Sequence, residues 1–120
     1  MAEAKTLLIV RKPPYGLVDS WEVMRLALSL YAANLPVSVV FAGGGVSNWV
    51  SKMAPEAAKA QSVARFVKDL EQFEIPVYLV SEDLAERGLG EPDLASHHPK
   101  MVSRAAVAQL VASHDCVVAV

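Results

Sequence analysis

The sequence predicts an α/β domain built on a parallel sheet with helices on both faces. Short apolar runs rich in β-branched residues alternate with longer segments in which apolar residues recur at helical spacing. The runs are apolar throughout, which is typical of strands that are covered on both faces. We therefore expect a three-layer, flavodoxin-like domain with a parallel sheet of about five strands.

The first strand and the first helix are predicted at residues 6–12 and 20–33. The run TLLIVRK is apolar and β-branched, and the following PPYG ends it because proline cannot continue a strand ladder. Asp19 precedes Glu22 by three residues, which is the spacing of a capping box. The apolar positions that follow give the helix a wide face for burial.

The second strand, at residues 36–42, runs directly into three glycines at 43–45. These glycines predict either a tight exit from the strand with positive φ or a cradle in which backbone amides approach an anion. The tight exit is favoured, because the lysine and hydroxyl residue of a P-loop are absent. Pro55 suits the first turn of the next helix, whose apolar stripe continues to Leu70.

The third strand is predicted at residues 75–80, in the sequence IPVYLV. Ser81 is expected to cap the short helix that follows, because serine is a preferred N-cap residue. Arg87 and Gly88 are expected to close that helix, in the order that is typical of a helix C-terminus.

The last two strands are predicted at residues 100–103 and 116–120, after an irregular stretch at 89–100. Ser103 is expected to cap the helix between them. The run CVVAV predicts a closing strand in the core, so we expect the thiol of Cys116 to be buried and unreactive.

Composition limits the class of protein. The chain of 120 residues predicts one domain over residues 1–120. It has 11 basic and 13 acidic residues with no basic stripe, which argues against nucleic-acid binding. No stretch approaches the ~20 apolar residues that a membrane helix needs. The single cysteine excludes an internal disulfide and predicts a reducing, cytoplasmic location.

The apolar content predicts an oligomer. Hydrophobic residues make up 53% of the chain and the mean hydropathy is +0.32, which is high for a small domain. Part of this apolar surface is expected at a subunit interface. Trp49, Val50 and Met53 are the candidates for its centre, since they follow the glycines where no strand or long helix is predicted.

The candidate ligand site lies where three loops are expected to converge at the carboxyl edge of the sheet. The loops are 12–19, 43–48 and 80–82. Their candidate ligand-binding residues are Lys12, Tyr15, Gly44, Gly45, Asn48 and Ser81. Glu82 and Asp83 would repel an anion at close range, which favours a small polar ligand or the peptide tail of a partner.

The sequence predicts no catalytic group, cofactor or metal. Ser81 has no base close in sequence to activate it as a nucleophile. His97 and His98 are adjacent, so their side chains point in different directions, and no third metal ligand accompanies them.

The order and spacing of these segments resemble the DsrE/DsrF-like family of sulfur-relay proteins. The resemblance covers residues 5–120 and is carried by four stretches: RKPPYG, EVMRLALSLYAANLPVSVVFAGGGV, IPVYLVSEDLAERGL and LVASHDCVVAV. The start KPPYG is most similar to the DsrF/TusC branch. The resemblance implies a flavodoxin-like parallel sheet, trimeric or hexameric assembly, and sulfur carried as a cysteine persulfide.

In the DsrE/TusD-type members, the resemblance implies an acceptor cysteine at the end of the third strand. The matching residue here is Val80, or Ser81 if the alignment slips by one, and neither can hold a persulfide. Cys116 does not match the family position.

Two functions remain open. One is a non-catalytic subunit or binding module that forms homo-oligomers or assembles with related sulfur-relay subunits. The other is a small-ligand-binding protein or enzyme that uses the carboxyl edge without cysteine chemistry.

Overall fold

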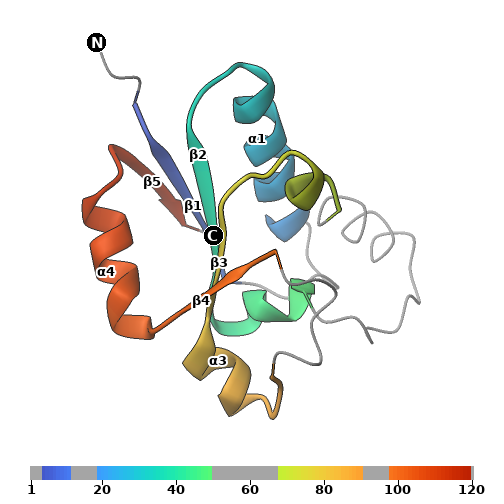
Figure 1. Ribbon diagram of the computed structural model, residues 1–120, viewed down its shortest axis with the longest axis vertical. Coiled ribbons are helices and arrows are strands. Elements are labelled where there is room, and N and C mark those ends of the chain that lie inside the picture. The colour runs from blue at the N-terminus through green and yellow to red at the C-terminus, as the bar shows by residue number, and fades with distance from the viewer. Residues whose placement is uncertain (1–3, 12–18, 50–67, 91–97, 120) are drawn as a thin grey trace.

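The computed structural model describes residues 4–11, 19–49, 68–90 and 98–119 (Figure 1). Its strands are β1 (Thr6–Val10), β2 (Val37–Phe41), β3 (Val77–Val80), β4 (Lys100–Val102) and β5 (Cys116–Ala119). Its helices are α1 (Asp19–Ala32), the 3-10 helix η1 (Gly43–Trp49), α3 (Ser81–Glu86) and α4 (Arg104–Ala112), and residues 68–72 are also helical. All five predicted strands and the predicted first helix are therefore present.

The five strands form one parallel sheet in the order β4-β3-β2-β1-β5. This confirms the predicted α/β class. The detailed order differs from the 2-1-3-4-5 order of flavodoxin, because β2 lies between β1 and β3 instead of at an edge. The chain steps across the sheet from β1 to β4 and then returns past β1 to form β5.

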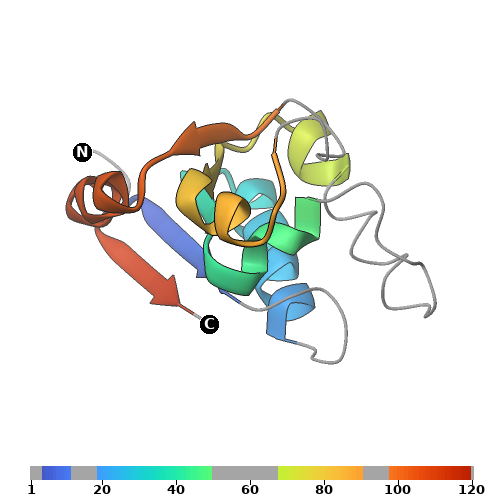
Figure 2. The ribbon, with the colours of Figure 1, turned by 90° about the horizontal axis from the view of Figure 1, so that it is seen from below.

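This path decides which helices cover which face. Right-handed crossovers place the helices of the forward steps on one face and the helix of the return step on the other. Figure 2 shows α4 on one side of the sheet and α1, η1 and the helical residues 68–72 on the opposite side. Among the described helices, α4 alone covers its face of the sheet.

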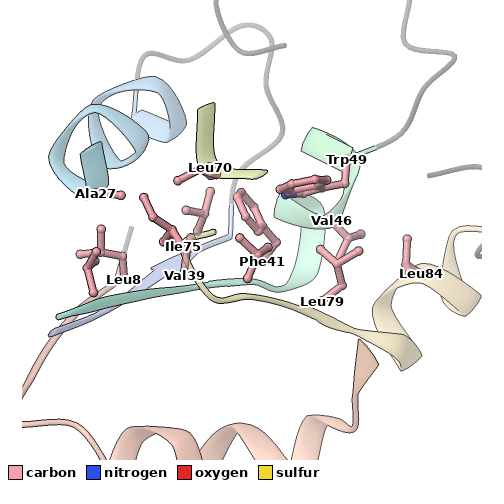
Figure 3. Packing of buried hydrophobic residues seen from close by; sticks show 13 residues of the cluster. Leu8, Ala27, Val39, Phe41, Val46, Trp49, Leu70, Ile75, Leu79 and Leu84 are labelled. Carbon is pink, nitrogen blue, oxygen red and sulfur yellow. The ribbon is translucent and has the colours of Figure 1, made fainter. Parts of the chain in front are cut away.

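The main hydrophobic core lies between the sheet and α1, η1 and residues 68–72 (Figure 3). Alternate residues of the strands point into it, and α3 closes its end with Leu84. The largest side chains that are fully buried are Leu7, Leu8, Phe41, Trp49, Leu70, Ile75, Leu79 and Leu84, of which all but Leu7 belong to this core. On the α4 face, a smaller cluster of Leu7, Val40 and Val80 is buried beneath Val107 and Leu110.

The prediction that Cys116 is buried in a core strand is wrong. β5 is an edge strand that pairs with β1 alone, and Cys116 is exposed. Val117 is also exposed, although it is apolar. The apolar run CVVAV has the composition of a central strand, but the strand order places it at an edge.

The prediction that Trp49 forms the centre of a subunit interface is also wrong. Its side chain is fully buried within this chain and packs edge-to-face on Phe41, with ring centroids 5.9 Å apart. The glycines before it let η1 fold back over the sheet, which brings the indole into the core. Val50 and Met53 lie outside the described residues.

Within residues 4–11, 19–49, 68–90 and 98–119, none of the helices combines the length and the hydrophobicity that a bilayer-spanning helix requires.

Candidate functional site

Two of the three predicted loops meet at the carboxyl edge of the sheet. β2 and β3 are parallel neighbours, so the turn after Phe41 and the turn after Val80 lie side by side. A hydrogen bond joins them, in which the backbone N–H of Gly43 donates to Oδ2 of Asp83 at 2.7 Å. β1 ends at the same edge, but residues 12–18 that follow it lie outside the described residues.

The structure places part of the predicted ligand-binding set at this edge. Gly44 and Gly45 belong to η1, and Ser81 is the first residue of α3. Asn48 is also in η1, and its side chain lies outside the described part. Lys12 and Tyr15 belong to the first loop and lie outside the described residues. The ligand-binding role of the set stays a prediction.

The glycines after β2 have clear structural roles. Gly43 has a φ of +55°, which favours glycine. Gly45 is so close to β1 that a Cβ atom would lie 2.0 Å from the carbonyl oxygen of Val10. The Gly43 N–H is bonded to Asp83, and the Gly45 N–H donates to the Ala42 carbonyl at 2.9 Å. Both amides therefore have acceptors within the chain, which fits the tight exit better than an anion cradle.

The prediction that Ser81 caps α3 is wrong. The N-cap residue is Val80, which has extended backbone angles and no capping side chain. The Ser81 hydroxyl is half-buried and lies near two acceptors instead, the Val102 carbonyl at 3.2 Å and the Glu82 carboxylate at 3.3 Å. Ser81 thus links the ends of β3 and β4.

The predicted caps at the other end of α3 and at α4 are correct, since Arg87 is the C-cap and the Ser103 hydroxyl accepts from the Ala106 N–H.

Asp83 organises this edge. It is 7% exposed and is the buried charged residue of the described core. Its Oδ2 accepts from Gly43, and its Oδ1 pairs with the Arg104 guanidinium at 2.7 Å. Arg104 also pairs with Glu86 at 3.2 Å, and its backbone N–H donates to Glu82 at 2.8 Å. We call this set of Gly43, Glu82, Asp83, Glu86 and Arg104 the edge clamp, because it ties together the turns after β2, β3 and β4.

The edge clamp stabilises the charged form of Asp83. Burial alone would raise the pKa of this carboxyl, but the hydrogen bond from Gly43 and the contact with Arg104 outweigh burial and lower the pKa. The pKa of Glu82 is also lowered, by the backbone N–H groups of Glu82 and Arg104. The Asp83 contact in turn raises the pKa of Arg104. At neutral pH the carboxylates of Glu82 and Asp83 and the guanidinium of Arg104 are therefore charged.

We expect acid to weaken the fold through Asp83. Its pKa is lowered in the folded state, so its contribution to the free energy of unfolding is complete above the ordinary carboxyl pKa of about 4 and is lost as the pH falls through the folded value. Urea unfolding of the wild type and of Asp83→Asn from pH 7 to pH 3 measures this. The wild type should be more stable at pH 7, and the difference should shrink towards pH 3. If the difference in stability between the wild type and Asp83→Asn stayed the same from pH 7 to pH 3, the role assigned to Asp83 would be contradicted.

The end of β3 offers no group for cysteine chemistry. Val80 is buried against the α4 face, and Ser81 carries a hydroxyl with two neighbouring acceptors. Cys116 opens β5 and pairs with Thr6 at the start of β1, so it lies at the amino edge of the sheet. It is separated from Ser81 by the length of the strands.

The sequence reasoning missed the roles of Asp83 and Arg104. The sequence indicates Asp83 only as a negative charge that would repel an anion, and it assigns no role to Arg104. The two are far apart in the sequence, so no local spacing indicates their contact. The one available signal is that Asp83 precedes the core residue Leu84, which places the carboxylate close to the buried layer.

Comparison with known proteins agrees with this architecture. Among solved structures, the chain is similar to the YchN protein from E. coli, with a TM-score of 0.85, 20% identity, and 98% of this chain and 99% of that chain covered. It is also similar to MTH1491 from Methanobacterium thermoautotrophicum, a protein of unknown function, with a TM-score of 0.69, 12% identity, and 98% and 100% covered. At these identities the likeness shows the fold alone. No curated protein sequence matches the chain.

The sequence model of the DsrE/DsrF-like family matches residues 4–120. This range includes every element of the sheet and both sides of the edge clamp. It also agrees with the resemblance that the four sequence stretches predict. The chain therefore belongs to the DsrE/DsrF-like family.

Proposed function

We propose that this protein is a non-catalytic DsrE/DsrF-like subunit, related to intracellular sulfur relay, that acts by assembly with partners instead of carrying sulfur itself. The proposal rests on the identity of the residues at the end of β3. The family resemblance implies a cysteine there, and this chain has Val80 and Ser81. Neither side chain has the thiol that forms a persulfide.

The chemistry of sulfur transfer explains why a serine cannot replace the cysteine. The acceptor thiolate attacks the outer sulfur of the donor persulfide, so that a new S–S bond forms, the donor S–S bond breaks and the donor leaves as a thiolate. A hydroxyl is about as acidic as water and is not ionised at neutral pH. The Ser81 hydroxyl also lies within hydrogen-bond distance of Val102 and Glu82.

The position of Cys116 supports the same proposal. The cysteine is exposed, but it lies on an edge strand at the amino edge of the sheet. A donor that docks at the carboxyl edge, near the edge clamp, would not reach it. Cys116 is therefore excluded as a sulfur acceptor by its position in the sheet, and not by the burial that the sequence predicted.

The edge clamp supports a role in assembly. It fixes three turns at one edge of the sheet, and its outer members are accessible, with 55% of the Arg104 side chain and 59% of the Glu86 side chain exposed. A surface with a positive and a negative group in fixed positions suits a partner of complementary charge. We propose that this edge contacts a related cysteine-bearing subunit or another copy of this chain, in a trimer or a hexamer.

We expect the wild-type protein to gain no sulfur from a protein donor that carries a persulfide. The double variant with Ser81→Cys and Cys116→Ser should gain one sulfur atom, because it restores a thiol at the family position. Intact-mass measurement under native conditions reports both results, and sedimentation equilibrium of the same samples reports the assembly. Stoichiometric sulfur on Cys116 of the wild type would contradict the proposal, and a clean monomer that copurifies with no related subunit would contradict the assembly role.

A further inference from the structure

A hollow of about 610 Å³ opens at the amino edge of the sheet, at the opposite end of the strands from the edge clamp. Its walls come from the residues before β1, the start of β2, the residues before β3 and the end of α4. Its volume is within the range of small-molecule sites, roughly 300–1,000 Å³. The lining residues that bear on its chemistry are Lys5, Tyr31, Glu74, Tyr78, Leu110 and His114.

Helix ends make this hollow electronegative. In a parallel α/β fold the helices run opposite to the strands, so their carboxyl ends gather at the amino edge of the sheet. α1, the helical residues 68–72 and α4 all end beside the hollow, at the upper end of the molecule in Figure 1. The last carbonyl groups of a helix carry a partial negative charge that favours cations.

Glu74 adds a full negative charge to the same region. It follows residues 68–72 with a φ of +55°, and its backbone N–H donates to the Glu71 carbonyl. Within the described part of the chain, no hydrogen bond or ion pair engages its carboxylate. Glu74 is exposed and lines the hollow, where its carboxylate can meet a ligand.

Among the described residues of the lining, Lys5 is the lysine, and an acid lies beside its backbone. Lys5 precedes β1 and Glu74 precedes β3, and β2 lies between these two strands, so Lys5 and Glu74 come from non-adjacent parts of the wall. On the far side of Lys5, the Asp115 carboxylate accepts the Lys5 backbone N–H at 2.8 Å. Asp115 therefore places a carboxylate beside the Lys5 backbone, on the opposite side of β1 from β2 and the Glu74 wall.

The remaining lining suits a cation with an apolar body. Tyr31 stacks on Phe73 with ring centroids 5.1 Å apart, and Tyr78 is half-buried in the wall. The faces of such rings attract cations, and Leu110 supplies apolar contact beside them. His114 also lines the hollow, and its Nδ1 lies 2.6 Å from the Leu110 carbonyl.

We propose that the amino-edge hollow binds a small organic cation, an amine or ammonium group attached to an apolar body. The cationic group lies towards Glu74 and the helix ends, and the apolar body lies between Tyr31, Tyr78 and Leu110. This site is separate from the edge clamp and does not depend on the function proposed for that edge.

Three small molecules that share a phenylpropyl group and differ in charge test the proposal. They are 3-phenylpropylammonium, 3-phenylpropanol and 3-phenylpropionate, titrated into the ¹⁵N-labelled full chain with amide chemical shifts as the readout. We expect the ammonium to bind with a Kd on the order of 1 mM, as its small size allows. It should shift the amides of Leu35, Val37, Ser38, Tyr78 and His114, while the alcohol binds several-fold more weakly and the carboxylate more weakly still.

Variants separate a charge effect from a general apolar effect. Glu74→Gln should weaken ammonium binding by about threefold or more and should leave the alcohol unchanged. Glu71→Gln is the matched control, because Glu71 is an exposed acid that precedes the same turn and does not line the hollow. The proposal is overturned if the carboxylate binds as tightly as the ammonium, if the shifted amides lie around residues 43–45, if no amide shifts, or if Glu74→Gln and Glu71→Gln behave alike.

Discussion

Gly45→Ala is expected to lower the free energy of unfolding by about 3 kcal/mol or more. A Cβ atom at Gly45 would lie 2.0 Å from the Val10 carbonyl oxygen and 2.7 Å from the Val10 carbonyl carbon. Both are backbone atoms at the end of β1, so no side-chain rotation relieves the clash. Either η1 or the end of β1 has to move, and both elements pack in the main core. Urea unfolding followed by circular dichroism measures the loss.

Gly88→Ala is the matched control for this experiment. Gly88 has a φ of +69°, so an alanine there is strained, but nothing lies within 4 Å of its Cβ position. We expect a loss of about 1 kcal/mol from the backbone strain alone. If the Gly45→Ala variant were as stable as the Gly88→Ala variant, or more stable, the close approach of η1 to β1 would be contradicted.

Trp49→Ala is expected to lower the free energy of unfolding by about 3–5 kcal/mol. The indole is fully buried and packs on Phe41, and its ring lies 6.4 Å from the His98 ring. Truncation would leave a cavity in the part of the core that holds η1 over the sheet. Thermal and urea unfolding at several protein concentrations measure the effect.

Trp49→Phe distinguishes packing from polarity at the same position. The indole Nε1–H is buried without a hydrogen-bond partner among the described residues. An unsatisfied buried donor costs about 1–3 kcal/mol, so its removal offsets part of the lost packing, and we expect Trp49→Phe to be clearly more stable than Trp49→Ala. If Trp49→Ala weakened assembly and left the stability of the subunit unchanged, then Trp49 would lie at a subunit interface instead.

The sequence alone was sufficient for the elements of the fold. Apolar runs predict β1, β2 and β3, which are buried in the sheet, and periodicity predicts α1 because one helical face is buried. The apolar run at 116–120 predicts β5 as well, although that strand is exposed at an edge. Ser103 caps α4 as predicted, since capping depends on a backbone N–H only a few residues away. The glycine exit after β2 is also a local property, set by the positive φ of Gly43.

The tertiary structure decided which of these elements meet. Cys116 is exposed because β5 is at an edge, and the composition of CVVAV carries no information on strand order. Ser81 contacts Val102 instead of capping α3, and Asp83 binds Gly43 and Arg104, because partners far along the chain compete with local ones. Periodicity, capping and turn propensity act within a few residues, whereas the strand order depends on the packing of the whole chain. The sequence therefore determined the family fold and the missing thiol, while only the folded chain brought together the edge clamp and the amino-edge hollow.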